Sequence, residues 1–404
     1  MAYVMSRFPK LTETFILYEI LAQESAGVQI HVFPLLREHE EILHPEAQRL
    51  VDAAHYQPFM SLRILGSQLR MLARQPGAYL GTLGSLLWAN RKSRNHFVGA
   101  LGIFPKTVHN AREMERLGIE HVHAHFATHP AAAGWIIHRL TGISYSFTAH
   151  GSDIHVDRTG LAPKVADAAF VAAISEFNRQ VIVDECGPWA AKIVEVLHSG
   201  VDTDHFRPQE RPRHADGRLR IICIGTMHEV KGQAYLLEAC ASLARDGVDF
   251  TCRLVGDGPD EPMLRATAVR LGITEQVVFE GRRTRDEIAA LLAETDVLVT
   301  PSVPASDGKR EGIPVVLMEA MASGVAVVAS RLTGIPELVR DGETGLLAEP
   351  RDVVGLAGAL RRLHDDPALR SRLAAAGRSL VQRDFDIRRN AAALVERVER
   401  AVAR

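Results

Sequence analysis

The sequence predicts an α/β protein made of two doubly wound domains, each with a parallel sheet covered by helices. Short apolar segments typical of buried strands alternate with helical segments from residue 2 to about residue 205. Residues 206–217 are polar and contain proline, as an interdomain linker would. The same alternation begins afresh at residue 219, which predicts a second domain of the same class.

The composition argues against several functional classes. The 404-residue chain is 47% hydrophobic and 24% charged, with a net charge of −2, which disfavours a generally basic nucleic-acid binder. Its four cysteines form no C-x-x-C pair, so neither a disulfide framework nor a zinc knuckle is indicated, in keeping with a reducing cytoplasm. We find no signal-peptide pattern and no run of 18 apolar residues.

In the first half, the first strand is expected at residues 2–5, and a helix begins after it with Thr12 as its cap. Further strands are expected at residues 28–35, 144–148, 168–174 and 192–197. Ligands of doubly wound sheets bind at the carboxyl ends of the strands. The polar residues between the first strand and its helix are therefore candidates for ligand contact.

Residues 53–112 contain basic residues but no acidic ones. The basic residues are Arg63, Arg70, Arg74, Arg91, Lys92, Arg94, Lys106 and Arg112. Leu62, Leu65, Leu69 and Leu72 recur at helical spacing, and Trp88 and Phe97 flank the second basic cluster. Such a helix can lie on an anionic membrane surface, which we expect for residues 60–112. A core helix with a solvated basic face, or a patch for an acidic acceptor, are the alternatives.

Histidines concentrate in residues 119–155. His121, His123 and His125 alternate as along one face of a strand, with no carboxylate or cysteine nearby in sequence, so we expect no metal site. The strand instead delivers His125 to its carboxyl end. His150, followed by Gly151, ends the next strand, where a polar group can meet a ligand close to the backbone. A purely structural role for His150 is the alternative.

The second half repeats the strand, loop and helix pattern, and Lys231 falls between its first strand and first helix. A lysine at that place is well positioned to meet a phosphate as a point charge. Further strands are expected at residues 250–255, 277–279, 297–300 and 325–329, with a helix at about 285–294. No G-x-G-x-x-G fingerprint with an acid about twenty residues later is present, which disfavours a dinucleotide dehydrogenase.

Residues 311–319 combine two carboxylates with a helix start. Pro314 suits the first helical position, so Glu311 should lie on the preceding loop and Glu319 along the helix. The amides of Gly312 and Ile313 would then point out of a helix N-terminus, which favours a phosphate. Glu311 could take the hydroxyls of a sugar and Glu319 the ribose diol of a nucleotide sugar. Two solvated glutamates, or a membrane span over residues 312–330, are the alternatives.

Together these segments resemble family-4 glycosyltransferases, retaining enzymes of the GT-B fold. The resemblance rests on Val255–Pro259, Pro301–Ser302, Glu311–Glu319, Gly334–Val339 and Asp341–Leu347. Ser6–Ile16 and Phe147–Ile154 resemble the exopolysaccharide, colanic-acid-type branch. The match covers almost the whole chain except about 53–112.

The resemblance implies two Rossmann-like domains facing across a cleft. They would be an acceptor domain at 1–205 and a nucleotide-sugar domain at 218–383, and a helix at 384–404 would cross back to the first domain. It implies hexosyl transfer from a nucleotide diphosphate sugar to a saccharide or lipid-linked saccharide in polysaccharide biosynthesis, without metal or cofactor. Such an enzyme would be cytoplasmic or peripheral on the inner face of the cell membrane.

The implied site residues fall into three sets. The catalytic set is His150, Lys231 and Glu311. The donor-binding set is Gly225, Thr226, Lys231, Gly256, Gly312, Ile313, Pro314 and Glu319. The acceptor-side set is Arg7, Phe8, Thr14, His125 and Asp153.

The chain departs from the family at Thr226, where an arginine usually contacts the diphosphate. A hydroxyl cannot replace a bidentate guanidinium, so either Lys309 or Arg310 substitutes or the diphosphate is held less tightly. Two alternative functions follow. One is a nucleotide-sugar epimerase of the same architecture. The other is a catalytically silent sugar-nucleotide-binding scaffold, which Thr226 favours.

Overall fold

The computed structural model describes residues 1–10, 13–38, 46–209 and 217–403. The chain divides into two compact units, unit 1 with residues 1–197 and 391–404 and unit 2 with residues 198–390. The division after Leu197 precedes the expected boundary at residue 205. The physical reason is that Val201 and Phe206 are buried in the core of unit 2. Of the expected linker, residues 210–216 lie outside the described residues.

Unit 1 contains a six-stranded parallel sheet with the order β2-β1-β3-β4-β5-β6. Its strands are β1 (Ala2–Phe8), β2 (His31–Arg37), β3 (His121–His125), β4 (Ser144–Ala149), β5 (Phe170–Ala173) and β6 (Val194–Val196). β2 begins at His31, three residues after the expected start. β1 and β3 are neighbours in the sheet although β2 lies between them in sequence. The carboxyl end of β1 therefore lies beside the carboxyl end of β3, which carries His125.

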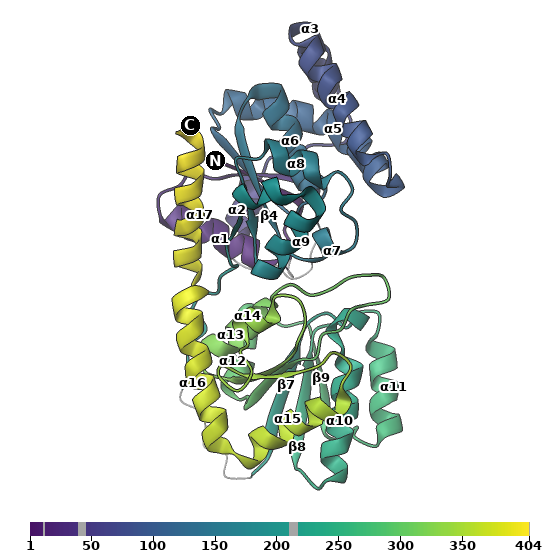
Figure 1. Cartoon of the computed structure of the whole chain (residues 1–404), viewed down its shortest axis with the longest axis vertical. Helices are drawn as coiled ribbons and strands as arrows, with labels where there is room; N and C mark the ends of the chain where they lie inside the picture. Colours follow the sequence, from purple (N-terminus) through teal and green to yellow (C-terminus); the bar gives the residue numbers. More distant parts are fainter. Residues whose placement is uncertain (11–12, 39–45, 210–216, 404) are drawn as a thin grey trace. The chain divides into compact units, whose positions relative to one another are not determined.

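Helices cover both faces of this sheet (Figure 1). They are α1 (Thr14–Ser25), α2 (Ala47–Ala53), α3 (Leu62–Arg74), α4 (Pro76–Asn90), α5 (Arg94–Arg116), α6 (His129–Thr141), α7 (Ser152–His155), α8 (Leu161–Asp167), α9 (Glu176–Cys186) and the 3₁₀ turn η1 (Pro188–Lys192). α1 and α2 pack on one face, and α5, α6 and α8 on the other. The expected cap Thr12 lies outside the described residues. The long basic stretch forms three helices rather than one.

Unit 2 contains a second six-stranded parallel sheet, with the order β12-β11-β10-β7-β8-β9. Its strands are β7 (Leu219–Ile224), β8 (Phe250–Val255), β9 (Val277–Gly281), β10 (Val297–Thr300), β11 (Ala326–Ser330) and β12 (Leu346–Ala348). Successive residues of β7, such as Ile221 and Ile222, point to opposite faces of the sheet and belong to different hydrophobic clusters. This is the pattern of a sheet buried on both faces, and the predicted doubly wound class is confirmed for both units.

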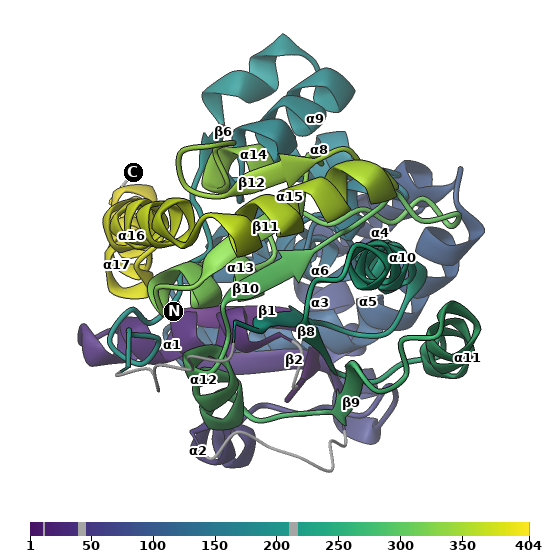
Figure 2. The ribbon, with the colours of Figure 1, turned by 90° about the horizontal axis from the view of Figure 1, so that it is seen from below.

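The helices of unit 2 lie on both sides of its sheet. They are η2 (Glu229–Lys231), α10 (Gln233–Arg245), α11 (Glu261–Leu271), α12 (Arg285–Ala293), α13 (Val315–Ala322), α14 (Ile335–Leu338), α15 (Val353–Asp365) and α16 (Pro367–Asp384). Figure 2 shows α10 and α12 on opposite sides of the sheet. α17 (Ile387–Val402) follows, and from Ala391 onward it belongs to unit 1, where Leu394 and Val398 pack on Phe170.

No helix in the described part of the chain combines the length and apolar character needed to cross a membrane. The alternative of a membrane span over residues 312–330 does not match the structure of that segment. That segment is instead the short buried helix α13 followed by the strand β11, both in the core of unit 2. All four cysteines are free thiols.

Candidate functional site

In unit 2, the structure brings Lys231 and Glu311 together. Lys231 ends the turn η2 after β7, and its Nζ lies 2.7 Å from Oε1 of Glu311, on the long loop after β10. The two side chains are 23% and 16% exposed, so the pair is partly shielded from water. β7 and β10 are neighbours in the sheet, which explains how residues far apart in sequence meet.

Two glycines let the backbone segments at these strand ends pack closely together. A Cβ on Gly256 would lie 2.2 Å from the carbonyl oxygen of Gly225, so the ends of β7 and β8 are in backbone contact. Gly232 has a φ of +67°, and a Cβ there would lie 1.9 Å from the carbonyl oxygen of Pro301, just after β10. Only glycine fits at Gly232 and Gly256 without moving the loops.

The loop that carries Glu311 is held by Thr333. Its hydroxyl donates to the carbonyl oxygens of Glu311, at 2.6 Å, and Gly312, at 3.1 Å. α13 begins at Val315, and Pro314 is its N-cap with an extended ψ of 126°. The expectation that Pro314 is the first helical residue was therefore wrong by one position. Gly312 is half-buried and Ile313 is buried, both on the loop ahead of the helix.

Glu319, on α13, is only 8% exposed. Burial raises the pKa of its carboxyl to about 7, although the charge of Arg285 opposes the shift. Arg285 begins α12 and pairs with Asp202 at 3.3 Å. A buried carboxyl with a pKa raised in this way is a candidate for ligand contact.

The residues around the missing arginine are exposed. Thr226 lies on the surface, and its carbonyl oxygen accepts a hydrogen bond from Nε2 of Gln233 at 3.0 Å. Lys309 Nζ pairs with Asp307 at 2.7 Å, and Arg310 is exposed on the same loop. Replacement of the arginine by Lys309 or Arg310 stays a prediction.

Two buried polar atoms at these strand ends were not anticipated from the sequence. Among the described residues, neither Oγ1 of Thr300 nor Nδ1 of His228 has a hydrogen-bond partner. Thr300 is the last residue of β10, and His228 lies on the loop after β7. Buried polar atoms are usually paired, so both are candidates for ligand contact. A polar residue ending a buried strand before Pro301 was the available signal.

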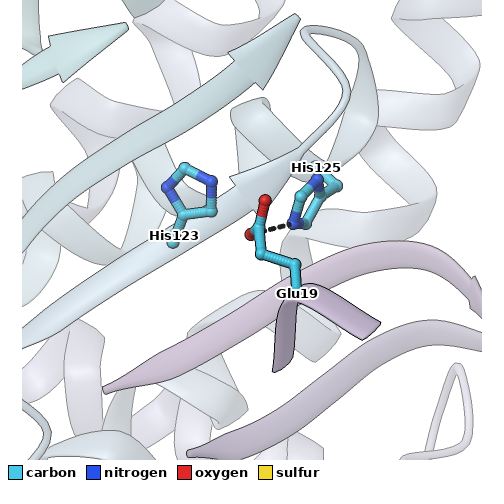
Figure 3. A group of neighbouring side chains, drawn as sticks. All are labelled: Glu19, His123 and His125. Atoms are coloured by element: carbon cyan, nitrogen blue, oxygen red, sulfur yellow. Dashed lines mark ion pairs between the residues drawn. The ribbon is translucent and has the colours of Figure 1, made fainter. Parts of the chain in front are cut away.

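In unit 1, His125 lies between Glu19 and His150 in a row of polar contacts. Figure 3 shows the first of these contacts, with the carboxylate of Glu19 beside the ring of His125. His125 ends β3, and its Nδ1 lies 3.0 Å from Nε2 of His150, which directly follows β4. Its Nε2 lies 3.2 Å from Oε1 of Glu19, on α1. The rings of Phe15 and Phe126 lie 4.6 Å and 4.8 Å from that of His150. Sequence spacing gave no sign of Glu19, because it comes from a different element.

The other two histidines of β3 are paired with hydroxyls of β4. Both ring nitrogens of His123 are engaged, Nδ1 with Ser146 at 2.8 Å and Nε2 with Thr148 at 2.9 Å. His121 bonds similarly to Ser144 and to Ser146. Burial lowers the pKa of His121 to about 3 and that of His123 well below its ordinary value. These histidines are therefore neutral hydrogen-bonding groups at physiological pH.

A metal site was not expected here because no carboxylate lies nearby in sequence. That reasoning was wrong, since the structure brings Glu19 within 4.8 Å of donor nitrogens of His123 and His125. Two of these three residues already use their polar atoms in other hydrogen bonds. His123 bonds two hydroxyls, and Oε1 of Glu19 accepts the Tyr3 hydroxyl at 2.6 Å. The group is better described as a hydrogen-bond network.

The remaining residues that were predicted for the acceptor side lie in different environments. Asp153 accepts backbone N–H groups of Ala127 at 2.8 Å, Gly151 at 2.6 Å and His150 at 3.1 Å. It thus braces the loop that carries His150. Phe8 is buried in the core, and Arg7 pairs with Glu38 at 2.9 Å on the surface. Thr14 is half-buried at the start of α1.

Three comparisons bear on this arrangement. The family model described as "Glycosyl transferases group 1" matches residues 218–366. The chain is 34% identical over 266 residues to the GDP-mannose-dependent alpha-(1-6)-phosphatidylinositol monomannoside mannosyltransferase of Mycolicibacterium smegmatis, covering 64% of this chain and 69% of that protein. It is also 34% identical to the amylovoran biosynthesis glycosyltransferase AmsK of Erwinia amylovora, but covers only 48% of each.

A solved structure shares the fold over nearly the full length. The structure of Anabaena Alr3699/HepE in complex with UDP-glucose superposes with a TM-score of 0.74, covering 98% of this chain and 99% of that one. At 17% identity, this likeness supports the two-domain architecture alone.

Proposed function

Because this chain belongs to the group 1 glycosyltransferases, we propose that it moves a hexosyl group from a nucleotide diphosphate sugar to a hydroxyl of a saccharide or lipid-linked saccharide. The transfer would retain the anomeric configuration and serve polysaccharide biosynthesis. The relatives named for amylovoran synthesis and for mannosyl transfer to a glycolipid support this substrate class.

The Lys231–Glu311 pair is the observation that carries the proposal. Without donor, each side chain neutralises the other at 2.7 Å. A bound nucleotide sugar would separate their roles, with the diphosphate taking Lys231 and the sugar hydroxyls taking Glu311. Glu319 would hold the ribose diol. Lys231 would then stabilise the negative charge that develops on the leaving diphosphate in an oxocarbenium-like transition state.

We further propose that no metal is needed, because Lys231 supplies the positive charge at the diphosphate. The leaving diphosphate would itself accept the proton of the acceptor hydroxyl. His150 would contact the transferred sugar, and unit 1 would supply the residues that bind the acceptor.

The test is binding and turnover of UDP-, GDP- and ADP-sugars by the full chain, in EDTA and without acceptor. A thermal shift with one donor, followed by slow release of its nucleoside diphosphate, supports the transferase. Interconversion of the sugar without release would instead indicate the epimerase. No shift with any donor would contradict the proposal and favour the scaffold alternative.

We also propose that α3 and α4 bind unit 1 to the anionic inner face of the cell membrane. α3 buries Ile64, Ser67 and Met71 but exposes four leucines on another side. The exposed apolar residues of this docking surface are Leu62, Leu65, Leu69, Leu72, Leu80 and Trp88. Arg63, Arg70, Arg74 and Arg91 are exposed beside them. Figure 1 shows both helices at the edge of unit 1. The positive charge favours anionic lipid and opposes self-association.

Lys106 does not contribute to this surface. Its ammonium is buried, donates to the carbonyl oxygen of Leu35 at 2.6 Å and lies over the ring of Phe59. Vesicle co-sedimentation tests the docking surface. Leu62→Gln/Leu69→Gln should weaken binding to vesicles containing phosphatidylglycerol by about tenfold. Leu117→Gln, an exposed leucine at the end of α5, should have no effect. Equal binding by all three proteins would contradict the surface.

A further inference from the structure

The row Glu19, His125 and His150 ends on a residue that the proposed function places beside the donor sugar. We propose that Glu19 is a positioning residue whose carboxylate sets the direction of hydrogen bonding through His125 to His150, so that His150 offers an acceptor nitrogen to a sugar hydroxyl. This inference rests on the proposed function for the identity of the ligand but not for the hydrogen-bond direction.

The contacts fix the order of the row. Oε1 of Glu19 faces Nε2 of His125 at 3.2 Å, and Nδ1 of His125 faces Nε2 of His150 at 3.0 Å. The first contact is bent, since His125 Nε2 has no well-aligned hydrogen-bond partner among the described residues. A carboxylate oxygen still excludes the tautomer with a lone pair on that nitrogen, because two lone pairs would then face each other.

The direction follows from counting donors. Glu19 can only accept when ionised, so His125 carries a proton on Nε2, and in the neutral ring its lone pair is then on Nδ1. That lone pair accepts from Nε2–H of His150. The proton of His150 is then on Nε2, and its Nδ1 is an acceptor. The sugar hydroxyl would donate to this nitrogen.

The surroundings favour an ionised Glu19 and a neutral His150. Burial would raise the pKa of Glu19, but His125, His123 and the Tyr3 hydroxyl together lower it below its ordinary value. Burial, with the nearby His125, lowers the pKa of His150 well below its ordinary value.

Several elements that pack around the row Glu19, His125 and His150 contribute neighbouring groups. Tyr3 on β1 bonds Glu19, His123 is on β3, and Asp153 on α7 accepts the backbone N–H of His150. Phe15 and Phe126 contribute apolar rings.

Glu19→Gln is the sharpest test, because an amide of the same shape can donate to Nε2 of His125. The donation would reverse both histidines and turn Nδ1 of His150 into a donor. We expect kcat to fall about 10²-fold, while the donor KM and the melting temperature change little. Glu19→Asp should recover part of the rate. Tyr3→Phe, which leaves the carboxylate in place, is the matched control.

Two further measurements separate positioning from a structural effect. Ring ¹⁵N spectra of histidine-labelled full chain without donor should show the unprotonated nitrogen of His150 at Nδ1 in the wild type and at Nε2 in Glu19→Gln. In addition, His150→Ala and the double variant should have the same kcat, because Glu19 acts through His150.

The outcomes are distinct from those that test the proposed function. Unchanged ring spectra in Glu19→Gln, or additive losses in the double variant, would overturn the inference even in an active enzyme. A melting-temperature rise with Zn²⁺ in the wild type but not in Glu19→Gln would also overturn it, since the carboxylate would then hold a cation. If no donor is turned over, the spectra still decide the hydrogen-bond direction.

Discussion

Units 1 and 2 are both six-stranded parallel sheets, yet they place ionisable side chains at their strand ends differently. Unit 1 buries histidines that bond to hydroxyls and to one another. Unit 2 holds a charged Lys231–Glu311 pair and the buried carboxyl of Glu319. The same fold can therefore present directional hydrogen bonds from one sheet and charge from another, which suits an acceptor side and a diphosphate side respectively.

The largest test of this comparison is acidification from pH 7.5 to 5.5, which should destabilise unit 1 more than unit 2. Burial holds the pKa of His121 at about 3 and of His129 at about 4, and lowers those of His123 and His150 well below normal. Unfolded histidines take up protons near pH 6.5, so this stability is present above that pH and is lost below it. At pH 5.5, one unit below the pKa of an unfolded histidine, four such groups together lower the free energy of unfolding by about 5 kcal/mol.

Hydrogen exchange read by mass spectrometry measures this effect in each unit separately. Peptides from β3 and β4 should lose protection at pH 5.5, after correction for intrinsic exchange, while peptides from β7 and β10 should lose less. Equal losses of protection in both sheets would contradict the inferred difference in electrostatics between the two units.

The second test removes the charge of unit 2. Lys231→Ala should lower kcat of transfer by about 10²–10³-fold, because a positioned charge at a developing anion has that effect. Lys192→Ala, at an exposed lysine of unit 1, is the control and should transfer at the normal rate. A Lys231→Ala enzyme with normal kcat would refute the role of the pair.

The third test uses Glu319, whose pH dependence has the opposite sign to that of the histidines. In the folded protein its pKa is about 7, above the ordinary value. Its contribution to folding stability is therefore present below about pH 4.5 and is lost as the pH rises to 7. Glu319→Gln should therefore raise the free energy of unfolding at pH 8 by up to about 3 kcal/mol, with little change at pH 5.

Urea unfolding at the two pH values measures this difference, with the exposed Glu275→Gln as control. Donor affinity should fall in Glu319→Gln despite the gain in stability. A variant that is stabilised equally at both pH values would show that the carboxyl does not titrate as inferred.

The smallest test compares helix caps. Thr284 caps α12 in unit 2 through a capping box with Glu287, and Ser175 caps α9 in unit 1 by accepting the N–H of Asn178 at 3.1 Å. Each change to alanine should cost about 1 kcal/mol. Hydrogen exchange should show the loss only in the unit that carries the change. Loss in both units would mean that they unfold together.

The sequence was informative where chemistry is local. Glu311 lies on a loop, Glu319 on the helix after it, and Lys231 after the neighbouring strand, as the motif and the strand order predicted. Their donor-binding roles stay a prediction. Glu19 was missed because it reaches His125 from α1, and only the pairing of β1 with β3 brings these elements together.

Side-chain direction was also beyond the sequence. Lys106 was counted with a basic surface, but it turns inward to a backbone carbonyl oxygen. Val201 was assigned to the first domain and Phe206 to the linker, although both apolar side chains belong to the core of the second domain. Periodicity identifies an apolar face without saying which core it joins.

The membership of α17 in both units has a consequence for synthesis on the ribosome. Unit 2 is one continuous segment, whereas unit 1 needs residues 391–404 to cover Phe170. The whole of unit 2 is therefore translated before unit 1 can be completed. The first unit to begin emerging is the last to be finished, and a nascent chain stalled before residue 391 would leave this small apolar cluster uncovered.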